Sequence, residues 1–158
     1  VEVIDISTAT EVAAGSSHTC ALVRGGDVEC WGAGEYGILG HGRETNWELY
    51  PVEVEGVSTA TDLSAGVEHN CVRLGSGGVS CWGRGSRGRL GHGSEFGSAT
   101  PVAAEGVSTA IDVTAAYDHS CAVLENDEVH CWGNAAGVQI DGSSGSYITS
   151  TPVKMTLE

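Results

Sequence analysis

The sequence predicts an all-β fold assembled from short strands in repeated four-stranded units. Three observations support this prediction: the chain repeats itself three times, alternating apolar and polar residues flank tight turns, and no segment has a helical period. Glycine supplies 24 of the 158 residues, about twice its average usage, which favours many turns and short strands. The chain has one Met and one Phe, which argues against a large helical-bundle core.

Three short motifs recur along the chain at offsets of 50 or 51 residues and define the repeats. They are a His-x-Cys motif, a Cys-Trp-Gly motif and a Pro-Val pair. Their copies begin at His18, His69 and His119, at Cys30, Cys81 and Cys131, and at Pro51, Pro101 and Pro152. We therefore divide the chain into repeats 1–51, 52–101 and 102–152, with residues 153–158 as the first strand of a further repeat.

Each repeat is expected to hold four strands. In the first repeat the second and third strands flank the turn at residues 24–26, and Val28 and Cys30 share one face of the third strand. The four expected strands of this repeat are Thr10–Ala14, His18–Val23, Asp27–Trp31 and Pro51–Glu55. Four strands in roughly fifty residues match one blade of a β-propeller.

The repeat resembles the regulator of chromosome condensation repeat over essentially the whole chain. The matching residues in the first copy are Ala14-Gly15, His18–Leu22, Val28, Cys30–Gly32, Gly37, Leu39-Gly40 and Pro51-Val52. The resemblance implies a β-propeller of four-stranded blades, usually about seven. It also implies functions as different as guanine-nucleotide exchange on a small GTPase, chromatin contact, light sensing and inhibition of secreted β-lactamases, so the fold is better indicated than the function.

Three blades do not close a propeller ring, which needs at least about four. The end blades then expose apolar faces, so we expect either a longer array or association between copies of the chain. Two chains would supply six blades, and a contact that does not close would produce a filament. The segments 1–5 and 152–157 are equivalent strands that could be exchanged between chains, with Val1, Val3, Val153 and Met155 as the exchanging residues.

The six cysteines form pairs ten residues apart, each centred on the turn between the second and third strands. The pairs are Cys20 with Cys30, Cys71 with Cys81, and Cys121 with Cys131. Disulfides across adjacent strands are one interpretation and imply an oxidising compartment. Reduced, buried cysteines are a second interpretation, and a zinc site is a third, although the spacing lacks the usual Cys-x-x-Cys pairs.

Two residue types recur in every repeat, which is typical of a role in the fold. A histidine two residues before the first cysteine is expected to fix the strand entry by a hydrogen bond to the backbone. A tryptophan after the third strand is expected to pack, with its indole N–H donating to a carbonyl. The residues are His18, His69 and His119, and Trp31, Trp82 and Trp132.

Two loop segments differ between repeats and are the candidate protein-binding residues. Trp47 and Tyr50 lie in a variable loop with no aromatic counterpart in the second repeat, and a loop tryptophan is a typical interface anchor. Arg84, Arg87 and Arg89 form the one basic cluster of an acidic chain, suited to an acidic face of a partner or an anionic ligand.

The charge balance excludes several classes of partner. Acidic residues outnumber basic ones 21 to 7, with a formal net charge of −14, which argues against nucleic-acid binding and against attraction to anionic lipid. No apolar run approaches the roughly 18 residues of a membrane span. We find no catalytic constellation, phosphate-binding loop or metal-ligand set, and expect no cofactor.

The sequence therefore predicts a non-enzymatic module that presents loops and self-associates through its end blades. The acidic, Cys-paired repeats resemble bacterial extracellular members of the family, which implies a secreted or cell-surface protein. The alternative is a binder or inhibitor of a protein partner. An exchange factor for a GTPase is disfavoured, because that role needs a complete propeller and an intracellular location.

Overall fold

The fold was determined as a computed structural model, which describes residues 6–134 and 148–155. It consists of three antiparallel four-stranded sheets, as the fold class predicted from the sequence requires. The strands are β1 (Ala9–Ala14), β2 (His18–Val23), β3 (Val28–Ala33), β4 (Trp47–Glu53), β5 (Ala60–Ala65), β6 (His69–Leu74), β7 (Val79–Gly83), β8 (Ser98–Ala103), β9 (Ala110–Ala115), β10 (His119–Leu124), β11 (Val129–Asn134) and β12 (Ile148–Lys154).

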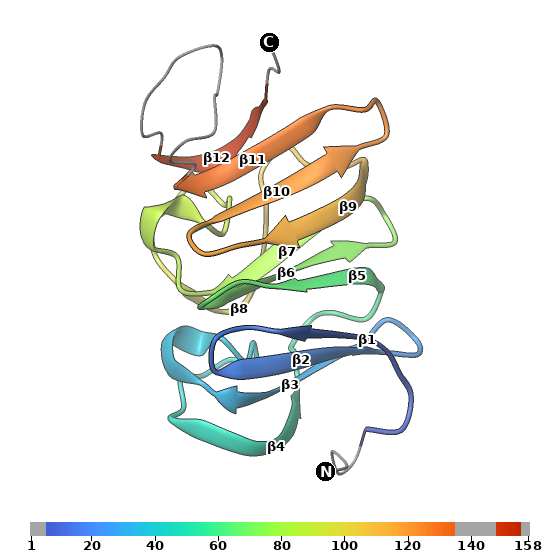
Figure 1. Ribbon diagram of the computed structural model, residues 1–158, viewed down its shortest axis with the longest axis vertical. Coiled ribbons are helices and arrows are strands. Elements are labelled where there is room, and N and C mark those ends of the chain that lie inside the picture. The colour runs from blue at the N-terminus through green and yellow to red at the C-terminus, as the bar shows by residue number, and fades with distance from the viewer. Residues whose placement is uncertain (1–5, 135–147, 156–158) are drawn as a thin grey trace.

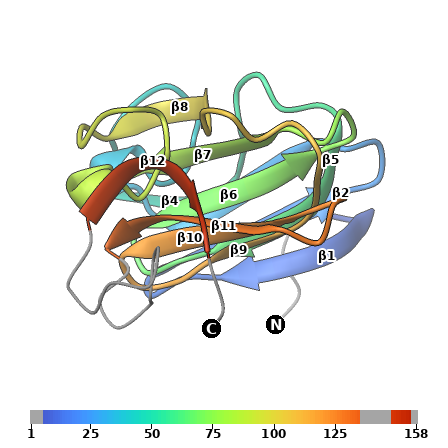
Figure 2. The same cartoon turned by 90° about the horizontal axis from the view of Figure 1, so that it is seen from above.

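The three sheets are stacked face to face along the long axis of the molecule (Figure 1). We call them blade 1 (β1–β4), blade 2 (β5–β8) and blade 3 (β9–β12), since within each sheet the strands lie in sequence order. Their first strands are neighbours: β1 contacts β5, and β5 contacts β9. In the view from above, β1 and β9 lie on one side and β8 on the opposite side (Figure 2).

The fourth strand of each blade shows how the sequence repeats relate to the sheets. β4, β8 and β12 extend past the expected repeat boundaries, and Val153 pairs with Cys131 inside blade 3. Met155 also belongs to blade 3, because its backbone N–H donates to Val129. Residues 153–155 therefore complete the third sheet and do not begin a further repeat. The spacing of the motifs gives the length of a repeat, but it does not show where each sheet ends.

Two apolar layers fill the spaces between the blades. The first joins residues of blade 1, such as Val28 and Leu39, to residues of blade 2, such as Leu63 and Trp82. The second joins blade 2 to blade 3 in the same manner, with Val79 and Leu90 against Val113 and Trp132. Blade 2 thus buries both faces, one against blade 1 and the other against blade 3, whereas blades 1 and 3 each bury one face in these layers.

Loops between the third and fourth strands reach across to the next blade. They contain two short 3-10 helices, η1 (Glu35–Gly37) and η2 (Ser86–Gly88), and the described residues hold no helix long and apolar enough to cross a membrane. Gly37 has φ +72°, and a Cβ built on it would lie 2.4 Å from the Cα of Ala99 in β8. Glycine is required there by both the left-handed backbone and the close approach.

Candidate interface at the ends of the blade stack

Carboxylates on the first strand of one blade cap backbone groups on the first strand of the next. The Leu63 N–H donates to Glu11 Oε2 at 3.2 Å, and the Val113 N–H donates to Asp62 Oδ2 at 3.2 Å. Both donors lie on the exposed edge of an innermost strand, where no strand pairs with them. Asp112 occupies the same repeat position in blade 3, so the sequence provides a carboxylate of this kind in each of the three blades.

These carboxylates face one another closely enough to change their protonation. Burial raises the pKa of Asp62, and the hydrogen bond and negative charge of Asp112 raise it further. Burial also raises the pKa of Glu11, followed by the charge of Asp62. A carboxyl group with a higher pKa in the folded chain than in the unfolded chain is harder to ionise when the chain is folded. At neutral pH its ionised form therefore lowers the free energy of unfolding, and this cost decreases as the pH falls through the raised pKa.

We therefore expect Asp62→Asn to stabilise the chain at pH 7.5 by about 0.5 kcal/mol, a small figure because solvent screens this partly exposed group. The amide oxygen still accepts the Val113 N–H while the negative charge is removed. At pH 4, close to the ordinary aspartate pKa of 3.8, the gain is expected to be smaller. Urea unfolding at the two pH values measures this, with the exposed Glu125→Gln as a control that changes little. A loss of stability at both pH values would contradict the prediction.

The repeated histidines form a second series of contacts between blades. The expected hydrogen bond to the backbone is wrong for His18 and His69, whose Nε2 atoms contact side chains of the next blade. His18 Nε2 lies 2.8 Å from Asn70 Oδ1, and His69 Nε2 lies 2.8 Å from Ser120 Oγ. Burial lowers the pKa of His18, and burial followed by the charge of Arg89 lowers the pKa of His69 to about 3. Both rings are therefore neutral at physiological pH, and each Nε2–H donates to a side chain of the following blade.

Each accepting side chain also donates a hydrogen bond to a loop of the preceding blade. Asn70 Nδ2 donates to the Ile38 carbonyl at 2.8 Å, and Ser120 Oγ donates to the Arg89 carbonyl at 3.0 Å. Because the hydroxyl of Ser120 donates to that carbonyl, it accepts from His69. Each pair of neighbouring blades is thus joined by the same two hydrogen bonds, one from a histidine to a polar side chain and one from that side chain to a loop carbonyl.

The repeated tryptophans show the packing role expected from the sequence in two blades. Trp82 and Trp132 are fully buried, and the Trp82 indole N–H donates to the Ile38 carbonyl at 2.8 Å. Among the described residues the Trp132 indole N–H has no such acceptor. Trp82 packs against Gly40 of blade 1, and Trp132 packs against Gly91 of blade 2. Trp31 is only partly buried, since the described residues include no blade before it.

Blade 1 leaves exposed several positions that blades 2 and 3 bury. Val12 is 61% exposed, whereas Leu63 and Val113 at the same repeat position are 4% and 5% exposed. Leu49 is 82% exposed at the position where Ala99 packs against Gly37. Trp47 begins the same strand and is 62% exposed. We define Val12, Trp31 and Leu49 as the N-end face.

Blade 3 leaves the opposite face of the stack less covered. Val28 and Val79 are fully buried in blades 1 and 2, whereas Val129 at the same repeat position is only partly buried. Cys121 and Val123 are partly buried as well. We define Cys121, Val123 and Val129, with the polar residues Asp112 and His119, as the C-end face. Among the described residues, the ring of His119 has no hydrogen-bond partner.

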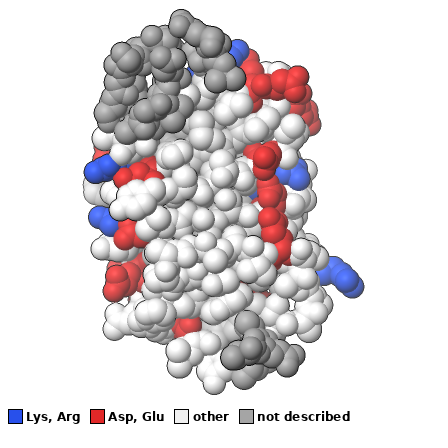
Figure 3. All heavy atoms as spheres, in the orientation of Figure 1, with Lys and Arg blue, Asp and Glu red and all other residues white. Residues whose placement is uncertain are grey.

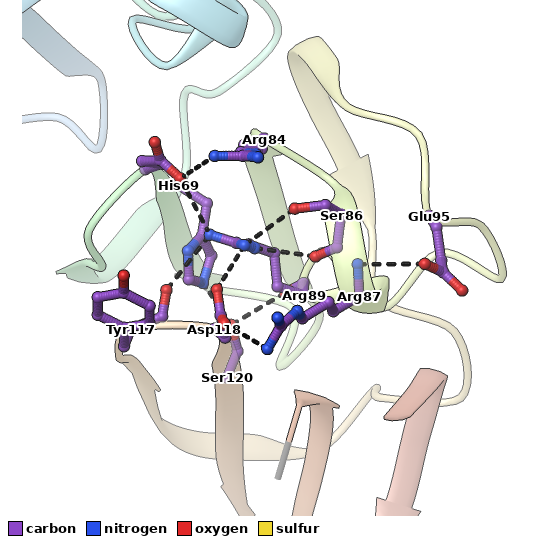
Figure 4. Close-up of polar contacts among 10 residues, drawn as sticks. His69, Arg84, Ser86, Arg87, Arg89, Glu95, Tyr117, Asp118 and Ser120 are labelled. Atoms are coloured by element: carbon purple, nitrogen blue, oxygen red, sulfur yellow. Dashed lines mark hydrogen bonds and ion pairs between the residues drawn. The ribbon is translucent and has the colours of Figure 1, made fainter. Parts of the chain in front are cut away.

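Arg89, which the sequence suggested as a protein-binding residue, lies between blades 2 and 3 with 3% of its side chain exposed (Figure 4). Its Nη2 lies 2.5 Å from Asp118 Oδ1, and its Nη1 lies 3.6 Å from Glu68 Oε2. Its remaining N–H groups donate to the Ser86 and Tyr117 carbonyls and to Ser86 Oγ. The guanidinium is thus fully used within the fold, and we keep the binding prediction only for Arg84 and Arg87.

Arg84 and Arg87 stay at the surface beside Arg89. Arg84 pairs with Glu68 at 2.8 Å and lies 4.8 Å above the ring of Tyr36, while Arg87 pairs with Asp118 at 3.1 Å. An open cavity of about 320 Å³ between the loops of blades 1 and 2 is lined by Tyr36, Arg84 and Phe96. Trp47 and Tyr50, the predicted interface anchors, lie in strand β4 and not in the loop that the sequence suggested, and Tyr50 is 60% exposed.

Each blade contains one disulfide between its second and third strands. The bonds join Cys20 to Cys30, Cys71 to Cys81, and Cys121 to Cys131, and the paired residues lie directly opposite each other in the strand register. The disulfide interpretation of the cysteine spacing is therefore the one the structure adopts. In residues 6–134 and 148–155, no group of three or more His, Cys, Asp or Glu side chains is placed to hold a metal ion.

Acidic side chains make up most of the charged surface on the face of the stack shown in Figure 3. Figure 3 shows Asp and Glu atoms in a column along the long axis, with Lys and Arg atoms near the margins of the view. This distribution agrees with the formal net charge of −14. The face disfavours polyanionic partners, since neutralising phosphates requires clustered basic side chains.

Stacked four-stranded sheets with equivalent contacts between neighbours define a segment of a β-propeller. A family model, the regulator of chromosome condensation (RCC1) repeat, matches residues 26–73 and 76–123, and a second model of this repeat matches residues 9–38 and 60–89. The chain belongs to the regulator of chromosome condensation repeat family.

Curated relatives share this repeat over part of the chain. The E3 ubiquitin-protein ligase HERC2 of Homo sapiens is 34% identical over 101 residues, which cover 61% of this chain and 2% of that protein. The Ultraviolet-B receptor UVR8 of Arabidopsis thaliana is 39% identical over 88 residues, which cover 52% of this chain and 19% of the receptor. The chain therefore spans only a small share of these relatives.

Solved structures show the same fold. Yeast RCC1 (Prp20), solved bound to Kap60, superposes with a TM-score of 0.81 at 19% identity over 97% of this chain and 38% of the yeast protein. Human WBSCR16 superposes with a TM-score of 0.81 at 22% identity over 94% of this chain and 39% of the human protein. At these identities the likeness concerns the fold.

Proposed function

We propose that this chain is a non-enzymatic protein-interaction module that associates with other copies of itself through its two end faces. The observation that carries the proposal is the contrast at one repeat position: Val12 is 61% exposed, and Leu63 and Val113 are 4% and 5% exposed. A position that two blades bury against a neighbouring blade is expected to be buried in the third as well, since an exposed apolar face is unfavourable in water.

The pairing of the last strand argues against association by strand exchange. β12 is already paired with β11, and Val153 and Met155 contribute to that pairing. Val1 and Val3, the other residues expected to exchange, lie outside the described residues. We therefore propose contact between sheet faces in place of exchanged terminal strands.

The relatives are compatible with a role in binding proteins. Yeast RCC1 was solved in complex with Kap60, and a second structure of Prp20p is described together with its binding properties to Gsp1p and histones. A propeller has rigid sheets with variable loops, which suits presentation of a binding surface. The three disulfides support an oxidising environment, and we propose that the protein is extracellular or at the cell surface.

Light scattering coupled to gel filtration is expected to give a mass above the 16.2 kDa of one chain, rising with concentration. Val12→Glu should shift the chain to the single-chain mass, because association would bury an unpaired charge. Ile111→Glu is the matched control: Ile111 is an apolar residue of β9 that is 51% exposed but belongs to neither end face. A wild-type chain that has the single-chain mass at every concentration would refute the proposed association.

A further inference from the structure

The two interfaces inside the molecule use the same residues in the same register. A carboxylate caps the N–H of Leu63 and of Val113, a histidine donates to Asn70 and to Ser120, and each contact joins one blade to the next along the chain. Direction is built into these contacts. The acidic and histidine side chains come from the earlier blade, and the groups they contact come from the later one.

The C-end face offers the groups that an earlier blade supplies. Asp112 corresponds to Glu11 and Asp62, and His119 corresponds to His18 and His69. Thr114 corresponds to Ser64, whose hydroxyl accepts the Ala115 N–H at 2.9 Å. Blade 3 therefore carries a carboxylate, a hydroxyl and an imidazole at the three positions that make polar contacts with a following blade.

The N-end face offers the groups that a later blade supplies. Thr19 corresponds to Asn70 and Ser120, which are fully buried, and its hydroxyl can accept from an imidazole N–H as the hydroxyl of Ser120 does. The backbone N–H groups of Val12 and Ala14 correspond to those of Val113 and Ala115, which a carboxylate and a hydroxyl cap. In blade 1 the described residues supply no such caps.

Resting on the proposed function, we propose that copies of this chain join head to tail, with the C-end face of one copy on the N-end face of the next in the register of the internal interfaces. In this arrangement Asp112 caps Val12, and His119 donates to Thr19 of the next copy. The two faces differ in chemistry, so the contact is heterologous, and each copy keeps one face free for a further copy.

A mixing experiment tests the direction of the contact. Val12→Glu disables the N-end face, and His119→Glu disables the C-end face, because histidines at this repeat position are buried between blades and a buried unpaired carboxylate is unfavourable. Each variant alone is expected to have the single-chain mass in light scattering. Mixed in equal amounts, they should form a complex of two chains. The two variants should bind each other at least about tenfold more tightly than either variant binds itself.

The outcomes separate this inference from the proposed function. A wild-type chain of single-chain mass overturns both. Two results would overturn the head-to-tail contact alone, provided that the wild-type chain associates. One is a His119→Glu variant that associates as well as the wild type, and the other is a mixture of the two variants that stays at the single-chain mass. Circular dichroism confirms that each variant is folded, and Thr114→Glu, a change at an exposed position of β9, serves as a second variant that disables the C-end face.

Discussion

Replacing Arg89 with alanine is expected to lower the free energy of unfolding by about 3–5 kcal/mol, the usual cost of removing one partner of a buried ion pair. The Arg89 side chain is 3% exposed, and it contacts Asp118 and Glu68. Burial lowers the pKa of Arg89, whereas the charges of Asp118 and Glu68 oppose that shift. Without the guanidinium, the partly exposed Arg87 is the one cationic partner that Asp118 keeps among the described residues. Urea unfolding below the concentration at which the chain associates measures the loss.

A neighbouring arginine provides the matched control. Arg84 also pairs with Glu68, but 39% of its side chain is exposed. Pairs of this kind contribute about 0–1 kcal/mol, so Arg84→Ala should cost much less than Arg89→Ala. Equal losses for the two variants would show that the buried network between blades 2 and 3 does not carry the stability assigned to it.

The Arg89 network shows what sequence patterns left out. The cluster at 84–89 is visible as charge, but its acidic partners are distant in the sequence and lie in two different blades. Comparison of the repeats nevertheless contains a sign of this ion pair. Arg89 stands where blade 1 has the buried Ile38, and Asp118 stands where blade 1 has Ser17, so a basic and an acidic residue appear together at positions that face each other.

The carboxylates between the blades were missed for a similar reason. In the sequence the acidic residues look scattered, yet Glu11, Asp62 and Asp112 are separated by one repeat length each. Only the stacking of β1, β5 and β9 converts that period into contact between neighbouring side chains. By contrast, the sheets themselves were predictable, because strand pairing around a tight turn is local and the alternation of Val28, Glu29 and Cys30 is visible directly.

The end faces combine both kinds of information. The number of repeats already predicted that the outer blades need a covering, either from a longer array or from other copies of the chain. It did not identify the surface left uncovered, because exposure depends on which face of each sheet meets the next blade. Comparing Val12 with Leu63 supplies that answer, and the opposite roles of His119 and Thr19 supply a direction. Repetition thus becomes most informative where one repeat differs from the others in burial.

Removing the central disulfide by replacing both Cys71 and Cys81 with alanine is expected to lower the free energy of unfolding by about 2–3 kcal/mol in the loop-entropy model. The two cysteines are ten residues apart and fully buried, so the unfolded chain gains conformational freedom and the core loses packed sulfur atoms. Changing both residues avoids leaving one reactive thiol. Urea unfolding of the variant and the wild type measures the difference.

The last blade offers the comparison that separates the two causes of this loss. Cys121 and Cys131 close a loop of the same length, but Cys121 is only partly buried at the C-end face. Removing that pair should cost the same chain entropy and less core packing, so its loss should be the smaller one in the single-chain state. Thiol titration of the unfolded, unreduced wild-type chain should find no free thiol. Six free thiols would contradict both the disulfides and the oxidising compartment proposed from them, because the cytosol keeps most thiols reduced.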